Sequence, residues 1–157
     1  MTNVIFLDID GPMISMGDLA IRPLTCIDRQ FDPQKIKMLN LMLELTDSFL
    51  CINSTHNTIR RDDKFSIVDD LIAAGVPPLR FYKIATTSYP QVNRFDAITE
   101  TVDAAGEDIK WVAIDDAWFL PEEDDRLVRV NNAYGIGYPE LWNVCTFFNV
   151  KPPLVMM

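Results

Sequence analysis

Short apolar runs alternate along this chain with longer stretches of helical periodicity. Four runs stand out as strands: VIFL (4–7), SFLCI (48–52), WVAI (111–114) and RLVRV (126–130). The first three are almost continuous in apolar residues, which is typical of central strands covered on both faces. The fourth alternates more between apolar and charged positions, so we expect it nearer the edge of a sheet.

The stretches between these runs predict helices. The first begins at Asp32-Pro33, a capping residue followed by proline at the first helical position. Apolar stripes over 65–72 and 92–102 predict two more, each followed by a glycine, and a fourth begins near Pro139. Strands that alternate with helices indicate a three-layer α/β sandwich with a mostly parallel central sheet.

Composition and charge narrow the class of protein. The 157 residues include no repeat and no linker, so we expect one domain over 1–157. Fourteen Lys and Arg against 23 Asp and Glu give a net charge of −9, which argues against a long groove for nucleic-acid backbone. No apolar run approaches the roughly 18 to 20 residues that cross a membrane, and the expected compartment is the cytoplasm.

The cysteines predict neither a disulfide framework nor a zinc site. The chain has three, Cys26, Cys51 and Cys145, which are widely spaced and form no CxxC pair. Cys51 lies within an apolar run and is expected to be a small buried hydrophobe.

Polar residues follow three of the predicted strands directly. They are DID (8–10), NSTHN (53–57) and DD (115–116). The carboxyl ends of parallel strands lie at one rim of a sheet, where ligands bind in this class of fold. So many carboxylates in one place would repel each other or take up protons. A hard divalent cation resolves this repulsion, and Mg²⁺ is the one usually held by a few carboxylates together with substrate phosphate.

These segments carry a resemblance to a known family. FLDIDG, INSTHN, VAIDDA and LVRVNNAYGIG, in this order, resemble the haloacid dehalogenase (HAD) superfamily, and most closely the short HAD domains of Swiss Army Knife RNA repair proteins. The resemblance extends from residue 4 to about residue 137. It implies a HAD-like, Rossmannoid fold with a minimal cap or none, and a Mg²⁺-dependent phosphomonoester hydrolase that works through an aspartyl-phosphate.

The resemblance also implies roles for the acids. Asp8 would be the nucleophile and Asp10 the general acid and base, while Gly11 would let the backbone turn near the phosphate. Mg²⁺ would be held by the Asp8 carboxylate, the Asp10 backbone carbonyl and one acid of the third strand end. We favour Asp116 as that ligand, with Asp115 as its neighbour.

For two further roles, the phosphate-binding hydroxyl and the phosphate-binding cation, the sequence offers two candidate residues each. The hydroxyl that binds phosphate is Ser54 or Thr55, and we prefer Ser54 because it stands closer to the strand. Alternatively, these hydroxyls only cap a helix that begins near residue 57. The family's cation corresponds to Arg94, with Lys83 as its competitor. His56-Asn57 stand where this branch often has Trp-Arg, which separates the chain from the branch at a position expected to contact substrate.

The sequence leaves the substrate open. A nucleotide or another small phosphoester is the first expectation. A polynucleotide end is the alternative, and it needs a local basic patch from Arg60, Arg61 and Lys64. A non-catalytic HAD-like binding protein is the remaining alternative. Residues 12 to about 31 are long enough only for a small flap, and closure of the site by oligomerisation stays open.

Overall fold

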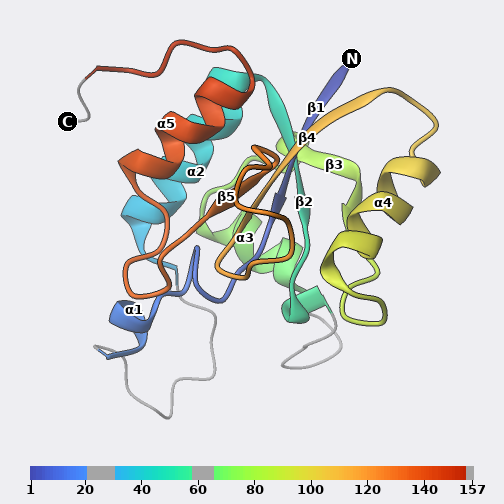
Figure 1. Ribbon diagram of the computed structural model, residues 1–157. Coiled ribbons are helices and arrows are strands. Elements are labelled where there is room, and N and C mark those ends of the chain that lie inside the picture. The colour runs from blue at the N-terminus through green and yellow to red at the C-terminus, as the bar shows by residue number, and fades with distance from the viewer. Residues whose placement is uncertain (21–30, 58–65, 155–157) are drawn as a thin grey trace.

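A five-stranded sheet lies between two layers of helices in the computed structural model, which describes residues 1–20, 31–57 and 66–154 (Figure 1). The strands are β1 (Thr2–Leu7), β2 (Ser48–Ile52), β3 (Phe81–Thr86), β4 (Ile109–Asp115) and β5 (Leu127–Arg129). Their order across the sheet is β3-β2-β1-β4-β5, and every neighbouring pair is parallel. The predicted α/β sandwich is therefore confirmed, and the fourth apolar run forms an edge strand as expected.

Helices cover both faces of this sheet. They are α1 (Met16–Ala20), α2 (Pro33–Thr46), α3 (Ile67–Ala74), α4 (Arg94–Ala104) and α5 (Tyr138–Phe147), with 3₁₀ turns η1 (Thr55–Asn57) and η2 (Pro78–Arg80). Helices α2, α3 and α5 pack on one apolar cluster and α4 packs on a second, in agreement with their positions in Figure 1. All four predicted helices are present, and the five-residue α1 is an addition that the sequence pattern does not show.

Strand β1 shows why the central runs are almost wholly apolar. Ile5 and Leu7 belong to the cluster under α2 and α5, whereas Val4 and Phe6 belong to the cluster under α4. Successive side chains of a strand point to opposite faces, so a strand covered on both faces needs apolar residues at every position.

Strand β3 (FYKIAT) is missing from the sequence-based prediction. It lies at the edge of the sheet, where most of its residues are only partly buried and Lys83 is exposed. A lysine in the middle of a short run interrupts the continuous apolar pattern that identifies central strands. Edge strands tolerate such residues because one side of the strand faces solvent.

Local signals define where the helices begin. The Asp32 side chain accepts a hydrogen bond from the Gln34 backbone N–H at 2.9 Å, and Pro33 opens α2 as expected. The Asn93 side chain caps α4 in the same way, accepting from the Asp96 backbone N–H at 2.8 Å. This cap sets the start of α4 and therefore places Arg94 in its first turn.

The described helices also bear on membrane association. In residues 1–20, 31–57 and 66–154, no helix has both the length and the apolar composition needed to cross a bilayer.

Candidate active site

The sheet hydrogen bonds continue past the strands and bring the predicted strand ends together. The Asp8 backbone N–H donates to Ile114 O at 2.9 Å, and the Asn53 N–H donates to Leu7 O at 2.9 Å. Residues leaving β1, β2 and β4 therefore meet at one rim, as the parallel topology requires. Asp8 and Asp115 are almost completely buried there, at 3% and 1% exposure.

Three carboxylates form a compact group at this rim. One oxygen from each of Asp8, Asp115 and Asp116 lies within 4.8 Å of the others. Gly11 makes this approach feasible, because a Cβ at Gly11 would lie 2.8 Å from Asp116 Cγ, and the backbone φ of +106° also favours glycine. Gly11 thus has a packing role against Asp116 in addition to the turn that we expected.

Burial and mutual repulsion make this group costly to ionise. Burial, reinforced by the charge of Asp115, raises the pKa of Asp8 to about 8, against the opposing effect of Arg94. Burial likewise raises the pKa of Asp115 to about 6. A carboxylate group with such pKa values is stabilised by a bound cation, and oxygen ligands suit Mg²⁺. The residues present therefore fit the expected metal.

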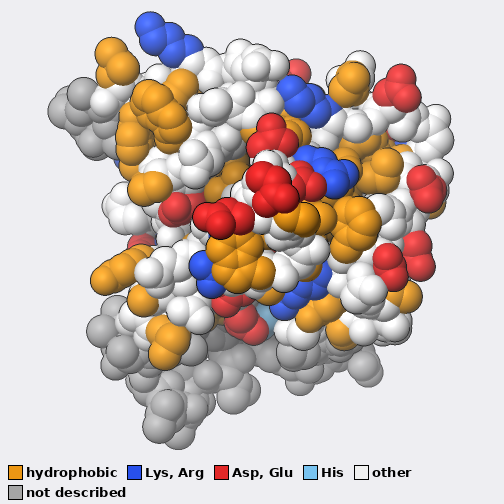
Figure 2. Space-filling view, viewed as in Figure 1, with side chains coloured by type: hydrophobic (Ala, Val, Ile, Leu, Met, Phe, Trp, Pro, Cys, Tyr) orange, Lys and Arg blue, Asp and Glu red, His pale blue; other side chains and the backbone are white. Residues whose placement is uncertain are grey.

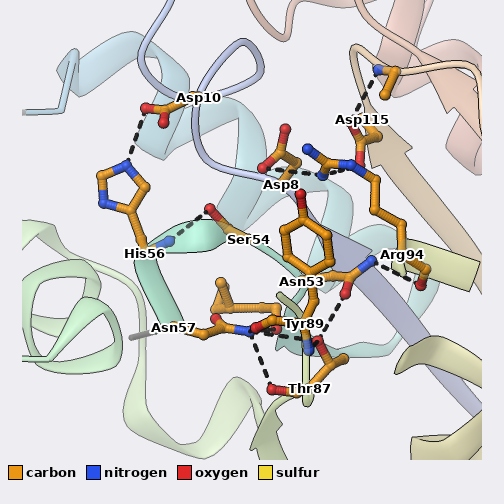
Figure 3. A network of polar contacts seen from close by, with 12 residues as sticks. Asp8, Asp10, Asn53, Ser54, His56, Asn57, Thr87, Tyr89, Arg94 and Asp115 are labelled. Carbon is orange, nitrogen blue, oxygen red and sulfur yellow. Dashed lines mark hydrogen bonds and ion pairs between the residues drawn. The ribbon is translucent and has the colours of Figure 1, made fainter. Parts of the chain in front are cut away.

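Arg94 reaches two of the three carboxylates. Its Nη1 lies 2.7 Å from Asp115 Oδ2 and 3.6 Å from Asp8 Oδ1. The Tyr89 ring packs on the guanidinium, with its centroid 4.5 Å from the Arg94 Cζ (Figure 3). Arg94 is thus held between an aromatic face and two carboxylates.

Lys83, the competing cation, is not brought to this group. Its Nζ donates to Ala105 O at 2.7 Å and lies 3.0 Å from Glu107 Oε2. Glu107 also bonds Thr2, the first residue of β1, so Lys83 lies toward the opposite end of the sheet from Asp8. The physical reason is the position of Lys83 within β3, three residues before the strand ends.

The hydroxyls lie in a tight turn after β2. Ser54 is fully buried, and its Oγ accepts a hydrogen bond from the His56 backbone N–H at 3.2 Å (Figure 3). The Asn57 N–H donates to Ser54 O at 3.0 Å, which closes η1. A helix that begins near residue 57 would continue into residues outside the described ranges, so the capping alternative stays a prediction. The Ser54 hydroxyl hydrogen is still a donor. Thr55 opens η1 and is half-buried.

Asp10 lies apart from the three clustered carboxylates. Its side chain is 63% exposed, and Oδ1 lies 3.0 Å from His56 Nε2 (Figure 3). Because the His56 backbone also bonds Ser54, this histidine connects the first and second strand ends. The sequence contains no signal for this contact, since a lone histidine after a strand has no distinctive spacing.

A buried polar network that the sequence analysis missed supports the start of α4. Thr87 Oγ1 donates to Asn53 Oδ1 at 2.7 Å, and Asn53 Nδ2 donates to Arg94 O at 3.4 Å. Asn57 Nδ2 donates to the backbone oxygens of Thr87 and Tyr89, each at 3.2 Å (Figure 3). Polar residues after the FYKIAT run are the signal that would have revealed this network, by the same strand-end rule.

A polar hollow of about 360 Å³ lies on the β5 side of the carboxylates. Asp116, Arg129, Val130, Asn131 and Asn132 line it. Arg129 Nε donates to Asp116 O at 3.2 Å, and its guanidinium carbon lies 4.5 Å from the exposed Trp118 ring. The site is therefore open beside Asp116.

Some expectations concern residues outside the described ranges. The proposed basic patch of Arg60, Arg61 and Lys64 lies there, as do Cys26 and residues 21–30 of the expected flap. Between β1 and α2, the described part of the chain contains only the short α1, in agreement with a minimal cap.

Comparison with protein families identifies the class. Residues 4–141 match the family described as the HAD domain in Swiss Army Knife RNA repair proteins, and the chain belongs to this family. No curated protein and no solved structure matched the chain. The resemblance inferred from the strand-end motifs is therefore confirmed, and membership supports a phosphatase-type function in an RNA repair context.

Proposed function

We propose that this protein is a Mg²⁺-dependent phosphomonoester hydrolase that works through an aspartyl-phosphate. The observation that carries this proposal is the setting of Asp8. Its buried carboxylate lies at a strand end beside two more acids, with Arg94 3.6 Å away. A nucleophilic carboxylate needs both partners, because phosphate repels it unless positive charge is close.

The Asp8 and Asp116 carboxylates and the Asp10 backbone carbonyl are the groups that would hold Mg²⁺. Asp115 is less available, because its Oδ2 pairs with Arg94 at 2.7 Å and its Oδ1 accepts from the Ala117 N–H at 3.0 Å. When bound, the metal neutralises phosphate charge and lets an anionic nucleophile approach phosphorus. This division supports Asp116 as the ligand and Asp115 as the residue that orients Arg94.

The protein residues then divide the reaction into two displacements. An Asp8 carboxylate oxygen attacks phosphorus, the bond to the leaving oxygen breaks, and Asp10 donates a proton to that oxygen. Asp10 next takes a proton from the water that attacks phosphorus, which releases phosphate and restores the Asp8 carboxylate. Arg94 and the Ser54 hydroxyl would bind the phosphoryl oxygens throughout.

Two substrate classes follow from different observations. Nucleotides and other small phosphoesters fit the net charge of −9, and Figure 2 shows acidic side chains gathered near the middle of one face. The acidic loop 122–125, which lines a hollow together with Arg129, would oppose a polyanion approaching past β5. The family description favours the alternative, the phosphorylated end of an RNA.

The test is phosphate release from nucleoside monophosphates, from 3′- and 5′-phosphorylated oligonucleotides and from small phosphoesters, with Mg²⁺ or with EDTA. We expect Mg²⁺-dependent turnover that Asp8→Asn lowers at least about a thousandfold, because the nucleophile is lost. Asp103→Asn, an exposed acid on α4, is the matched control and should keep full activity.

The outcomes separate the alternatives. Best turnover on oligonucleotides with a steep salt dependence identifies the end-repair activity. If no phosphoester is hydrolysed, and Asp8→Asn binds Mg²⁺ as well as the native protein does, the hydrolase proposal fails and a binding protein remains.

A further inference from the structure

An aromatic cleft of about 580 Å³ lies beside Arg94, and the proposed reaction does not use it. Three of its lining residues carry aromatic rings, and the rest are polar or small. The lining is Tyr89, Asn93, Arg94, Phe95, Asp96, Ala117 and Phe119.

The cleft is continuous with the candidate active site. Tyr89 follows β3, Ala117 and Phe119 follow β4, and the remaining lining residues form the start of α4. Arg94 belongs to both places, since its Nη1 lies near Asp115 and Asp8 and the residue also lines the cleft. A group attached to a phosphate held at Arg94 would therefore have the cleft next to it.

The charges of the cleft disfavour a second phosphate. The positive charge of Arg94 is already opposed by Asp115 and Asp8, and Asp96 adds a carboxylate to the lining. A further anion would meet this carboxylate without a free cation among the cleft residues named above. An anionic occupant is therefore disfavoured.

The aromatic walls select a flat occupant. Rings from Tyr89, Phe95 and Phe119 line the cleft and are each only partly buried, while the Tyr89 ring also packs on the Arg94 guanidinium. Stacking on aromatic side chains is how proteins hold unpaired nucleobases. A volume of about 580 Å³ lies within the ordinary range for small-molecule sites. Asp96 Oδ2 accepts a hydrogen bond from Asn93 Nδ2 at 2.8 Å, and the carboxylate has further acceptor capacity for ring N–H and exocyclic amino groups.

We propose that this cleft is the subsite for the nucleobase next to the scissile phosphate. The inference rests on the proposed hydrolase function and deepens it: the substrate is recognised as a single nucleotide unit, free or at a chain end, by one stacked base. The cleft contributes no binding to phosphates further along a polynucleotide.

Phe119→Leu tests the subsite, because it removes a ring while keeping an apolar side chain. We expect kcat/KM for adenosine and guanosine monophosphates to fall about 5- to 150-fold, the range for loss of one base stack. For glycerol phosphate, which has no ring, the factor by which kcat/KM falls should be at least five times smaller than for the nucleotides. Phe49→Leu is the matched control. Phe49 and Phe119 both pack on the apolar cluster under α4, but Phe49 lies on β2 and does not line the cleft.

A binding measurement keeps this test independent of turnover. In Asp8→Asn, guanosine monophosphate should shift the ring NMR signals of Phe119 and Tyr89 and bind more tightly than glycerol phosphate does. Phe119→Leu should remove that preference and Phe49→Leu should not.

The possible results distinguish the two proposals. Turnover of all phosphoesters with equal losses in Phe119→Leu overturns the base subsite and leaves the hydrolase intact. A preference for nucleotides in binding, without phosphate release by the native protein, overturns the hydrolase and supports the subsite. Equal affinity for nucleotide and glycerol phosphate in Asp8→Asn rejects the subsite whatever the turnover.

Discussion

His56 and Asp10 form a contact between the first two strand ends, with 3.0 Å separating Nε2 from Oδ1. The Asp10 side chain is largely exposed to solvent. In the proposed reaction Asp10 must point at the leaving oxygen and later at water. A ring held by the η1 turn is suited to keep this carboxylate in position.

Replacing His56 tests this positioning role. We expect His56→Ala to lower kcat about tenfold with a smaller change in KM, because Asp10 loses its orientation without loss of phosphate contacts. His56→Gln, which keeps an N–H donor, should recover a large part of kcat. Steady-state kinetics and the thermal midpoint of both variants provide the measurement. Equal kcat values for Ala and Gln would mean that the contact with Asp10 does not assist the reaction.

At the scale of elements, the loop after β5 is joined to the loop after β1. The Met16 N–H donates to Asn132 O at 2.8 Å, and the Ile136 N–H donates to Pro12 O at 2.9 Å. The buried Lys35 of α2 contributes an ion pair with Asp18 of α1, with Nζ 2.8 Å from Oδ2. These contacts support the first loop, which carries Gly11 and thus the turn against Asp116.

Gly135 lies at the centre of this junction and allows a controlled test. Its φ is +78°, and a Cβ there would lie 2.6 Å from Pro12 O and would also clash with Lys35 Cε. Gly106 has a similar φ of +69°, but a Cβ at Gly106 would have no other atom within 4 Å. We expect Gly106→Ala to cost about 1 to 2 kcal/mol, the cost of left-handed backbone alone. Gly135→Ala should cost at least about 2 kcal/mol more, because overpacking adds to the same backbone strain.

Chemical unfolding of the two glycine variants measures this difference directly. Equal losses of unfolding free energy would show that the junction adapts to a methyl group. Lower activity in Gly135→Ala, measured where that variant remains folded, would further indicate that the junction supports the site.

At the scale of the whole molecule, the carboxylate group opposes folding when no cation is bound. Asp8 has an ordinary pKa of 3.8, and the fold raises this pKa to about 8. The folded state therefore binds the proton more tightly than the unfolded state does. The resulting destabilisation is absent below pH 3.8. It grows as the pH rises from 3.8 to about 8, and it is complete above about pH 8.

Thermal unfolding of Asp8→Asn in EDTA should show this destabilisation. We expect the variant to melt above the native protein by a few degrees at pH 8, since about 1 kcal/mol corresponds to roughly 2 to 4 °C at this size. The difference should be smaller at pH 5. Added Mg²⁺ should raise the melting temperature of the native protein and have less effect on Asp8→Asn. A variant that melts below the native protein at pH 8 would contradict this account, and Asp103→Asn is the neutral control.

The sequence alone was sufficient for the three central strands and for the polar residues that follow them. VIFL, SFLCI and WVAI are covered on both faces, so burial demands an uninterrupted apolar run that is visible without a structure. The carboxyl ends of parallel strands share one rim, so a parallel sheet was enough to predict that Asp8 and Asp115 lie at the same rim. Family membership was accessible in the same way, because it depends on these same motifs.

Only the tertiary structure decided which partners these residues have. Arg94 and Lys83 are both plausible cations by residue type, but one opens α4 at the rim and the other lies within β3 toward the opposite end of the sheet. The Thr87 network and the Asp10–His56 contact join segments more than 30 residues apart. Periodicity reports how one segment is buried, whereas such contacts depend on how separate segments pack together. The aromatic cleft beside Arg94 arises in the same way, from loops that only the packed sheet brings together.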